Sequence, residues 1–439
     1  MMKLPPASVI CNRVMGFYIG LLPARFWRWW VSRSFLAAHK PERQLLIDVS
    51  IIIRHDARTG IQRVVRGVLR HILENPPQGF TVRAVFATRK RGYRYAPSSF
   101  ACAPMDVALS HGGRLRIGKG DVFLGLDNAL EPFALHQAQL MWYRLRGASV
   151  YVLVHDLLPL QRPEWFTLAL HESYRLWFAT VARVANGIFC VSGHTRDVLA
   201  NELRKRYSLT GENIGMKRIA LGADIEGSLP SMGMPEDSQD ILSCMKENGA
   251  VLMVGTVEPR KGYAQALAAF EELWRQGRSE LLVIVGKPGW GTETLQDKLQ
   301  THPEKGKRLF WLSGISDEYL LLLYKSARGL LMASEGEGFG LPLVEANRHG
   351  VHVLARDLPV FREVMGDAAT YFSDDAPEAL ASHIGTWLED EALAALPPSG
   401  LLCGVTWDQT AKEILAGLPL RAGYGAFGAS ASVELHEVT

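Results

Sequence analysis

The chain is poor in the features that mark several protein classes. Its five cysteines are spread over 439 residues and form no CxxC pair, which indicates buried or free thiols in a reducing compartment rather than a disulfide framework. Lys and Arg number 48 and Asp and Glu 45, and this near balance argues against a dedicated nucleic-acid-binding protein. The sequence holds no Asp-x-Asp motif and no cluster of metal-ligand spacing, so we expect no bound divalent ion.

Long hydrophobic runs are also missing. The apolar run Val14–Ala24 has 11 residues between Arg13 and Arg25, whereas a membrane-spanning helix needs about 20. A signal peptide would need small residues after its apolar core, but the sequence Arg-Phe-Trp-Arg-Trp-Trp follows. Overall, 48% of the residues are hydrophobic and 21% charged, which is ordinary for a globular protein and excludes disorder throughout.

The positive charge that the chain does have is concentrated at its N-terminus. Residues 1–43 hold seven Lys and Arg side chains and one Glu, together with Trp27, Trp29 and Trp30, so the rest of the chain is slightly acidic. Basic side chains interleaved with aromatic rings suit a helix that lies in a membrane surface. The alternative is an N-terminal extension that packs on the protein's own surface.

Short apolar runs alternate with helical patterns through most of the chain. Strands separated by helices predict parallel sheets covered by helices on both faces. The pattern runs through residues 44–225 and again through 250–390, and a stretch rich in Pro, Gly, Ser and acidic residues, 226–249, reads as a linker. We therefore expect an α/β protein with two doubly wound, Rossmann-like domains facing across a cleft, followed by a helical segment, 391–420, and a flexible tail, 421–439.

The most informative segment follows the expected strand Gly329–Met332 and opens a helix. Its glycines let the backbone approach a ligand, and free amides at a helix start attract anions. Glu337 and Glu345 can accept hydrogen bonds from ligand hydroxyls, although a helix cap and a solvated helix position are the alternatives for them. We expect the same turn to bind a ligand through Gly338, Phe339, Gly340 and Leu341.

Other candidates also follow expected strands. Arg260 and Lys261 come shortly after the strand Ala250–Val254 and can neutralise a diphosphate. His155 ends a strand of the first half and can donate to a sugar hydroxyl or to developing charge, or it can be bonded within the domain interface. The remaining candidates after strands are Thr256 and Gly286 in the second half and Gly60, Arg63, Asp127 and Asp156 in the first, with a local cap as the alternative for Asp156.

The run Glu337-Gly-Phe-Gly-Leu-Pro-Leu-Val-Glu345 resembles the Glu-x7-Glu signature of the retaining glycosyltransferases of family 4, also called glycosyltransferase group 1, which have the GT-B fold. The resemblance implies that Glu337 contacts the transferred sugar and Glu345 the ribose of the nucleotide. The run Pro259-Arg-Lys-Gly is similar to the family's phosphate motif and implies that Lys261 binds the diphosphate. Many members have an Arg where this chain has Thr256, and Arg260 is a possible replacement.

The resemblance also sorts the candidates into sites. It implies a catalytic set of Glu337, His155 and Lys261. The donor set comprises Lys261, Arg260, Glu345, Gly338, Phe339, Gly340, Leu341, Gly286 and Thr256. The acceptor side comprises Gly60, Arg63, Asp127 and Asp156, although the loop at Gly60 has one glycine where the family has two.

The resemblance implies a mannosyltransferase-like enzyme that retains the anomeric configuration. We expect it to move mannose or a related hexose from a nucleotide-diphosphate donor, GDP-mannose favoured, without a metal or other cofactor. The expected acceptor is a saccharide, lipid-linked, in the synthesis of bacterial O-antigen, capsule or exopolysaccharide. The protein would then be cytoplasmic and peripheral on the inner membrane, which it would bind through residues 1–43, and it would bind no nucleic acid.

Three other functions can be considered for the same architecture. A nucleotide-sugar epimerase would consume the donor without an acceptor, and a phosphorylase would need a Schiff-base lysine motif, which we do not find. A non-catalytic nucleotide-sugar-binding protein would bind donors without turnover. The substitution at Thr256 leaves this last alternative open.

Overall fold

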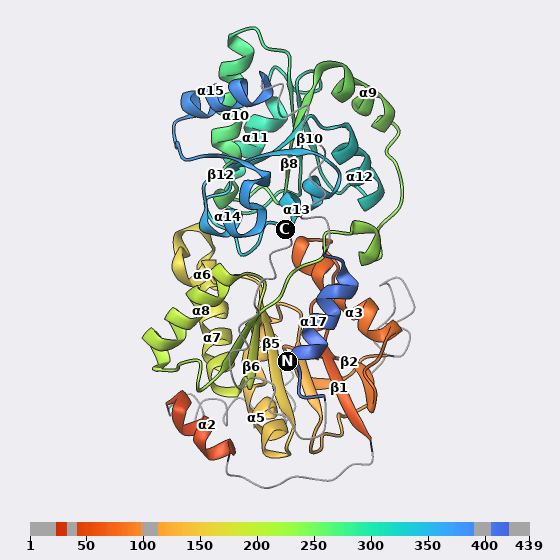
Figure 1. The fold of residues 1–439 in the computed structure, drawn as a ribbon, viewed down its shortest axis with the longest axis vertical. Helices are drawn as coiled ribbons and strands as arrows, with labels where there is room; N and C mark the ends of the chain where they lie inside the picture. The colour runs from red at the N-terminus through yellow and green to blue at the C-terminus, as the bar shows by residue number, and fades with distance from the viewer. Residues whose placement is uncertain (1–22, 33–41, 98–99, 101–112, 390–404, 421–439) are drawn as a thin grey trace, which may run out of the picture.

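A computed structural model describes residues 23–32, 42–97, 100, 113–389 and 405–420 (Figure 1). The N-terminal domain contains a sheet of seven strands in the order β3-β2-β1-β4-β5-β6-β7. All neighbouring strands are parallel except β2 and β3, which pair antiparallel. The strands are β1 (Arg43–Asp48), β2 (Phe80–Thr88), β3 (Arg91–Tyr95), β4 (Val122–Gly125), β5 (Ser149–Val154), β6 (Gly187–Cys190) and β7 (Gly215–Arg218).

Helices cover both faces of this sheet because its strands are apolar on both sides. One buried cluster includes Leu46 and Phe123 on one face, and a second includes Leu45 and Leu124 on the other. The covering helices are α3 (Gly60–Glu74), α4 (Leu130–Leu135), α5 (Gln137–Leu145), α6 (Leu158–Gln161), α7 (Leu168–Val184) and α8 (Gly193–Tyr207). Alternate residues of each strand thus supply two separate cores.

The C-terminal domain contains a parallel sheet of six strands in the order β10-β9-β8-β11-β12-β13. Its strands are β8 (Ala250–Val254), β9 (Leu281–Val285), β10 (Leu309–Leu312), β11 (Gly329–Met332), β12 (His352–Arg356) and β13 (Thr370–Phe372). Its helices are α9 (Ser238–Asn248), α10 (Tyr263–Arg275), α11 (Glu293–Thr301), α12 (Asp317–Ser326), α13 (Leu341–Arg348), α14 (Pro359–Met365) and α15 (Pro377–Glu389). The expected fold class, two doubly wound α/β domains, is confirmed.

Some predicted boundaries differ from the structure. Helix α9 lies within the predicted linker 226–249 and packs against α12, so this part of the segment belongs to the C-terminal domain. The sequence pattern over 131–146 predicts one helix, but the structure divides this stretch at His136 into α4 and α5. The sequence pattern does not predict strands β3, β7 and β13. Residues 391–404 and 421–439 lie outside the described residues.

The chain returns to the N-terminal domain after the C-terminal domain is complete. Helix α17 (Trp407–Gly417), blue in Figure 1, lies beside α3 and packs against it. The Trp407 side chain is fully buried there. It takes the space that a side chain at Gly67 would fill, since a Cβ at Gly67 would come within 2.5 Å of the indole.

Part of the basic N-terminal segment is described as helix α2 (Ala24–Ser32). It packs against α7 and α5, and Arg28 donates to the carbonyl oxygens of Ala185, at 2.6 Å, and Asn213. These contacts agree with the alternative that this segment packs on the protein's own surface. Among the described residues, no helix combines the length and the apolar character needed to cross a membrane.

Candidate active site

The carboxyl ends of the two sheets carry the loops through which the domains meet. In the C-terminal sheet, strand order reverses between β8 and β11, the position at which doubly wound folds bind ligands. The loop after β8 carries Arg260 and Lys261, and the loop after β11 carries Glu337. The two motifs that sequence analysis selected therefore lie together at the switch point.

Glu337 is the centre of a buried polar cluster. Lys261 Nζ lies 2.5 Å from its Oε1 and Arg260 lies 2.9 Å from its Oε2, while the Ser334 hydroxyl donates to Oε1 at 2.9 Å. Burial alone would raise the pKa of Glu337, but Arg260 and Lys261 outweigh burial and lower the pKa to about 2. The carboxylate is therefore ionised and held in one orientation.

Arg260 is engaged by the protein itself. One terminal nitrogen contacts Glu337 and donates to the Gly336 carbonyl at 2.8 Å, and the other lies 2.7 Å from Glu258. Because Glu258 and the Gly336 carbonyl fix the guanidinium, Arg260 in turn orients Glu337. Lys261, by contrast, has Glu337 as its one partner among the described residues. Because an ammonium group has three N–H donors, Lys261 can also donate to a ligand.

Two helix N-termini face each other beside this cluster. Helix α13 begins after Gly340, which adopts a left-handed φ of 94° and provides no side-chain cap. Helix α3 of the other domain begins at Gly60, and a Cβ there would come within 3.2 Å of Leu341. The start of α3 is capped by Thr59 and Gln62, whereas α13 has no side-chain cap, so the partial positive charge and free amides at the start of α13 favour an anion.

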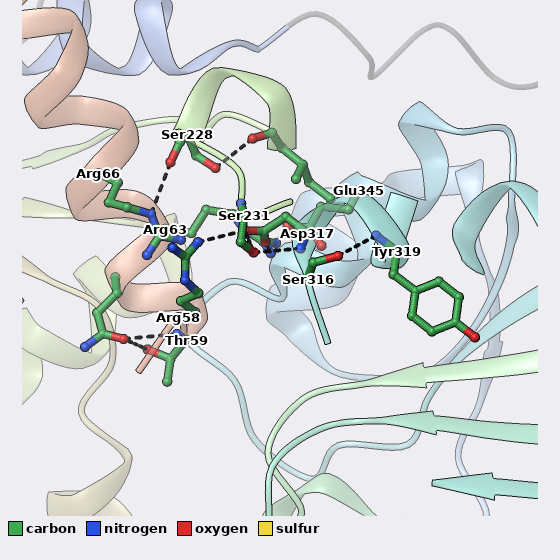
Figure 2. Close-up of polar contacts among 12 residues, drawn as sticks. Arg58, Thr59, Arg63, Arg66, Ser228, Ser231, Ser316, Asp317, Tyr319 and Glu345 are labelled. Atoms are coloured by element: carbon green, nitrogen blue, oxygen red, sulfur yellow. Dashed lines mark hydrogen bonds and ion pairs between the residues drawn. The ribbon is translucent and has the colours of Figure 1, made fainter. Parts of the chain in front are cut away.

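Glu345 lies one turn into α13 and contacts the opposite domain (Figure 2). Arg63 of α3 pairs with its Oε1, and the Tyr324 hydroxyl donates to its Oε2 at 2.9 Å. Arg63 also lies 2.6 Å from Asp317, whose second oxygen accepts from the backbone amide and hydroxyl of Ser231. Arg63, which was predicted on the acceptor side, therefore contacts two carboxylates of the C-terminal domain.

Further contacts join the loop after β9 to the N-terminal domain. Lys287 donates to the Ala57 carbonyl at 2.9 Å, and the Trp290 indole donates to the Trp165 carbonyl at 2.8 Å. Gly286 lies so close to β8 that a Cβ there would be 1.8 Å from the carbonyl oxygen of Gly255. Thr256 lies next to this loop, with its methyl group 3.1 Å from the position of a Cβ at Gly289.

His155 and Asp156 lie against the glycine-rich turn of the C-terminal domain. A Cβ at Gly338 would be 1.8 Å from the His155 carbonyl oxygen, so only glycine fits there. The His155 ring bonds to the Leu126 carbonyl at 3.3 Å, and burial lowers its pKa to about 4. Asp156 accepts from the Leu158 amide at 3.1 Å, which is the local cap considered as an alternative.

The remaining predicted residues have structural contacts. Asp127 accepts from the amides of Ile51 and Ile52 at 2.8 and 2.9 Å and so orients the loop after β1. Phe339 and Leu341 pack against the core of the N-terminal domain. Among the described residues, no group of three or more His, Cys, Asp or Glu side chains is arranged to hold a metal ion.

Sequence reasoning missed Asp317 and Tyr324. Asp317 begins the helix that follows β10, at the same carboxyl edge as the motifs already selected. Its position after a strand was a usable signal. Tyr324 is fully buried in α12 and reads as an ordinary core residue, so its bond to Glu345 becomes visible only in the fold.

The two doubly wound domains form a GT-B architecture, which the following solved structures share. A crystal structure of Anabaena Alr3699/HepE in complex with UDP and glucose has a TM-score of 0.57 and 17% identity, covering 86% of this chain and all of that one. The structure of WaaG, a glycosyltransferase involved in lipopolysaccharide biosynthesis, has a TM-score of 0.50 and 16% identity, covering 86% and 96%. At such identities the likeness shows the fold.

Sequence comparison is more specific. Residues 236–396 match the family model of glycosyl transferases group 1. The serotype-specific mannosyltransferase WbdA of Escherichia coli is 40% identical over 396 residues, which cover 90% of this chain and 47% of that protein. O-antigen chain mannosyltransferase B of Escherichia coli is 29% identical over 238 residues, covering 53% and 58%. The chain thus spans about half the length of WbdA, and the names of these relatives agree with the expected hexosyltransferase.

Proposed function

We propose that this chain transfers mannose from a nucleotide-diphosphate donor, GDP-mannose favoured, to a saccharide acceptor in O-antigen synthesis, with retention of configuration. The observation that carries the proposal is Glu337, which is ionised between Lys261 and Arg260 beside the uncapped start of α13. The names of the relatives support mannose and O-antigen.

The leaving diphosphate gains negative charge as the sugar departs. Lys261 has donors to spare, and the start of α13 has no side-chain cap, so both can stabilise that charge. Stabilisation of the leaving group by fixed donors needs no metal ion. This arrangement supports the expectation that the enzyme works without one.

Glu337 is better suited to holding the sugar than to attacking it. Both of its oxygens are bound to cations, and its low pKa makes it a weak nucleophile. An ionised carboxylate in a fixed orientation accepts hydrogen bonds from sugar hydroxyls. This favours a front-side displacement, which retains configuration without a covalent intermediate on Glu337.

The acceptor is proposed to be lipid-linked and the protein to work at the cytoplasmic face of the inner membrane. Helix α2 exposes Phe26 while Arg28 fixes the helix to the N-terminal domain. An anchored aromatic helix in a basic segment suits the interface of an anionic membrane.

The test begins with thermal-shift measurements against GDP, UDP, ADP and dTDP sugars, followed by transfer assays with the best donor. We expect Lys261→Ala to lower the transfer rate at limiting donor by about 100-fold or more, because one preorganised donor to developing charge contributes that much. Lys298→Ala, on the exposed side of α11, is the matched control. Normal transfer by Lys261→Ala would contradict the proposed site, and donor consumption without acceptor would favour an epimerase.

A further inference from the structure

We propose that Arg63 is the second cation of the donor's diphosphate site and that the N-terminal domain supplies it opposite Lys261. The proposal rests on the function proposed above and assigns one more residue to it. A diphosphate carries more than one negative charge, but Lys261 is a single cation, and Thr256 stands where the resemblance leads us to expect an arginine. The site therefore needs a second cation.

Arg260 does not supply this second cation. Its two terminal nitrogens already contact Glu337, Glu258 and the Gly336 carbonyl. Like Arg63, Arg260 has a buried Nε without a partner among the described residues, but its terminal nitrogens hold Glu337 in place, so moving it toward a ligand would displace the carboxylate proposed to hold the sugar. Arg260 is therefore a positioning residue for Glu337.

Arg63 has both the place and the spare donors. It lies one turn from Gly60, where the start of α3 meets Leu341 at the start of α13. Its side chain is nine-tenths buried, and only two of its five N–H groups have a partner among the described residues, the others including a buried Nε. A buried guanidinium with free N–H donors, close to the starts of α3 and α13, is suited to a ligand with several anionic oxygens.

The carboxylates that hold Arg63 have other partners. Asp317 accepts from the amide and hydroxyl of Ser231 (Figure 2). Glu345 accepts from the hydroxyl of Tyr324. A shift of Arg63 toward a diphosphate would therefore leave neither carboxylate without a hydrogen bond. Because Lys261 and Arg63 belong to different domains, a diphosphate bound by both would join them.

The test measures binding of inorganic pyrophosphate and of GDP by calorimetry at fixed ionic strength, using the full chain. We expect Arg63→Gln to weaken pyrophosphate binding about tenfold or more, the value of a charge-assisted hydrogen bond. The double variant Arg63→Gln/Glu345→Gln also neutralises Glu345, while Asp317 keeps its contacts with Arg58 and Ser231, so it guards against a folding defect of the single variant. It should lose the same affinity for pyrophosphate.

Asp317→Asn is the matched control, because it breaks the same contact between the domains but keeps the cation. We expect it to bind pyrophosphate at least as tightly as the unaltered chain. An equal loss in Asp317→Asn and Arg63→Gln would show that Arg63 only joins the domains. Full affinity in both Arg63 variants would overturn this inference alone, whereas an unaltered chain that binds neither GDP nor pyrophosphate would overturn the proposed function.

Discussion

Glu337, Arg260 and Lys261 depend on one another because their charged side chains are largely withdrawn from solvent. Removing one member of a buried ion pair leaves the other without compensation, and this costs more than the pair contributes when intact. The low pKa of Glu337 is a consequence of this pairing. Substitutions that keep shape and remove charge, such as Glu337→Gln, therefore test chemistry with less damage to the fold than Glu337→Ala.

His155 gives a prediction at the scale of a single residue. Burial, only partly offset by the bond to Leu126, lowers its pKa to about 4, against about 6.5 for a histidine in an unfolded chain. Between these values the unfolded chain binds a proton that the folded chain does not, so folding stability falls as pH drops from about 6.5 to about 4.

We expect His155→Gln to reduce this loss, since glutamine can donate to Leu126 and does not titrate. The measurement is the urea midpoint of each protein at pH 7.5 and pH 5. The unaltered chain should lose more stability between the two pH values than the variant does. Equal losses would mean that His155 is not held neutral by burial.

Gly338 gives a prediction at the scale of elements, since its turn is pressed between two domains. The hydroxyls of Ser192 and Thr195 donate to its carbonyl at 2.7 and 3.1 Å, and the His155 carbonyl leaves no room for a Cβ. Gly338→Ala should push the turn away from β5 and with it Glu337. A displacement of about 1 Å is enough to lower a rate about 100-fold.

The melting temperature should change little, because the contact lies between the domains and not within either core. Gly211→Ala is the control, as a Cβ there meets no neighbouring atom within 4 Å. Transfer assays and thermal melts of both variants give the answer. A Gly338→Ala protein with the normal transfer rate would show that this close contact does not position Glu337.

The sequence predicts helices and strands well where the hydrophobic periodicity is strong. It predicts them poorly where contacts between distant parts of the chain determine the local structure. The helix over 61–73 and its neighbouring strands were predicted within a few residues, as was the Ser192 cap, which accepts from Thr195. Helix α9 was missed because Pro, Gly and acidic residues before it hide a short amphipathic pattern. The pairing of Arg63 with Glu345 joins residues 282 positions apart, and no local pattern reports such a contact.

At the scale of the whole molecule, the chain crosses between its domains twice. It passes once from η3 (Ile225–Ser228) to α9 and returns before α17, which completes the core of the N-terminal domain with Trp407. The composition predicted a helix over 407–415 but not which domain it covers. This return explains why the matched family range, 236–396, lies between two parts of the N-terminal domain.

The segregation of charge leads to a prediction for the whole protein. Residues 1–43 are strongly basic, and α2 within them exposes Phe26. We expect the full chain to float with vesicles that contain phosphatidylglycerol, and less with phosphatidylcholine alone, because cations add to the burial of aromatic rings only at an anionic surface. Flotation should decrease as salt rises.

A chain of residues 44–439 should lose this binding, and Phe26→Ser should weaken it. Met232→Ser is the matched control, since Met232 is 71% exposed but lies in the connection between the domains. Deletion of residues 1–43 also removes the Arg28 contacts, so a thermal melt must show that the shortened chain is folded. Equal flotation of the folded short chain and the full chain would show that the basic residues of 1–43 do not contribute to membrane binding. The membrane contact would then lie elsewhere on the protein.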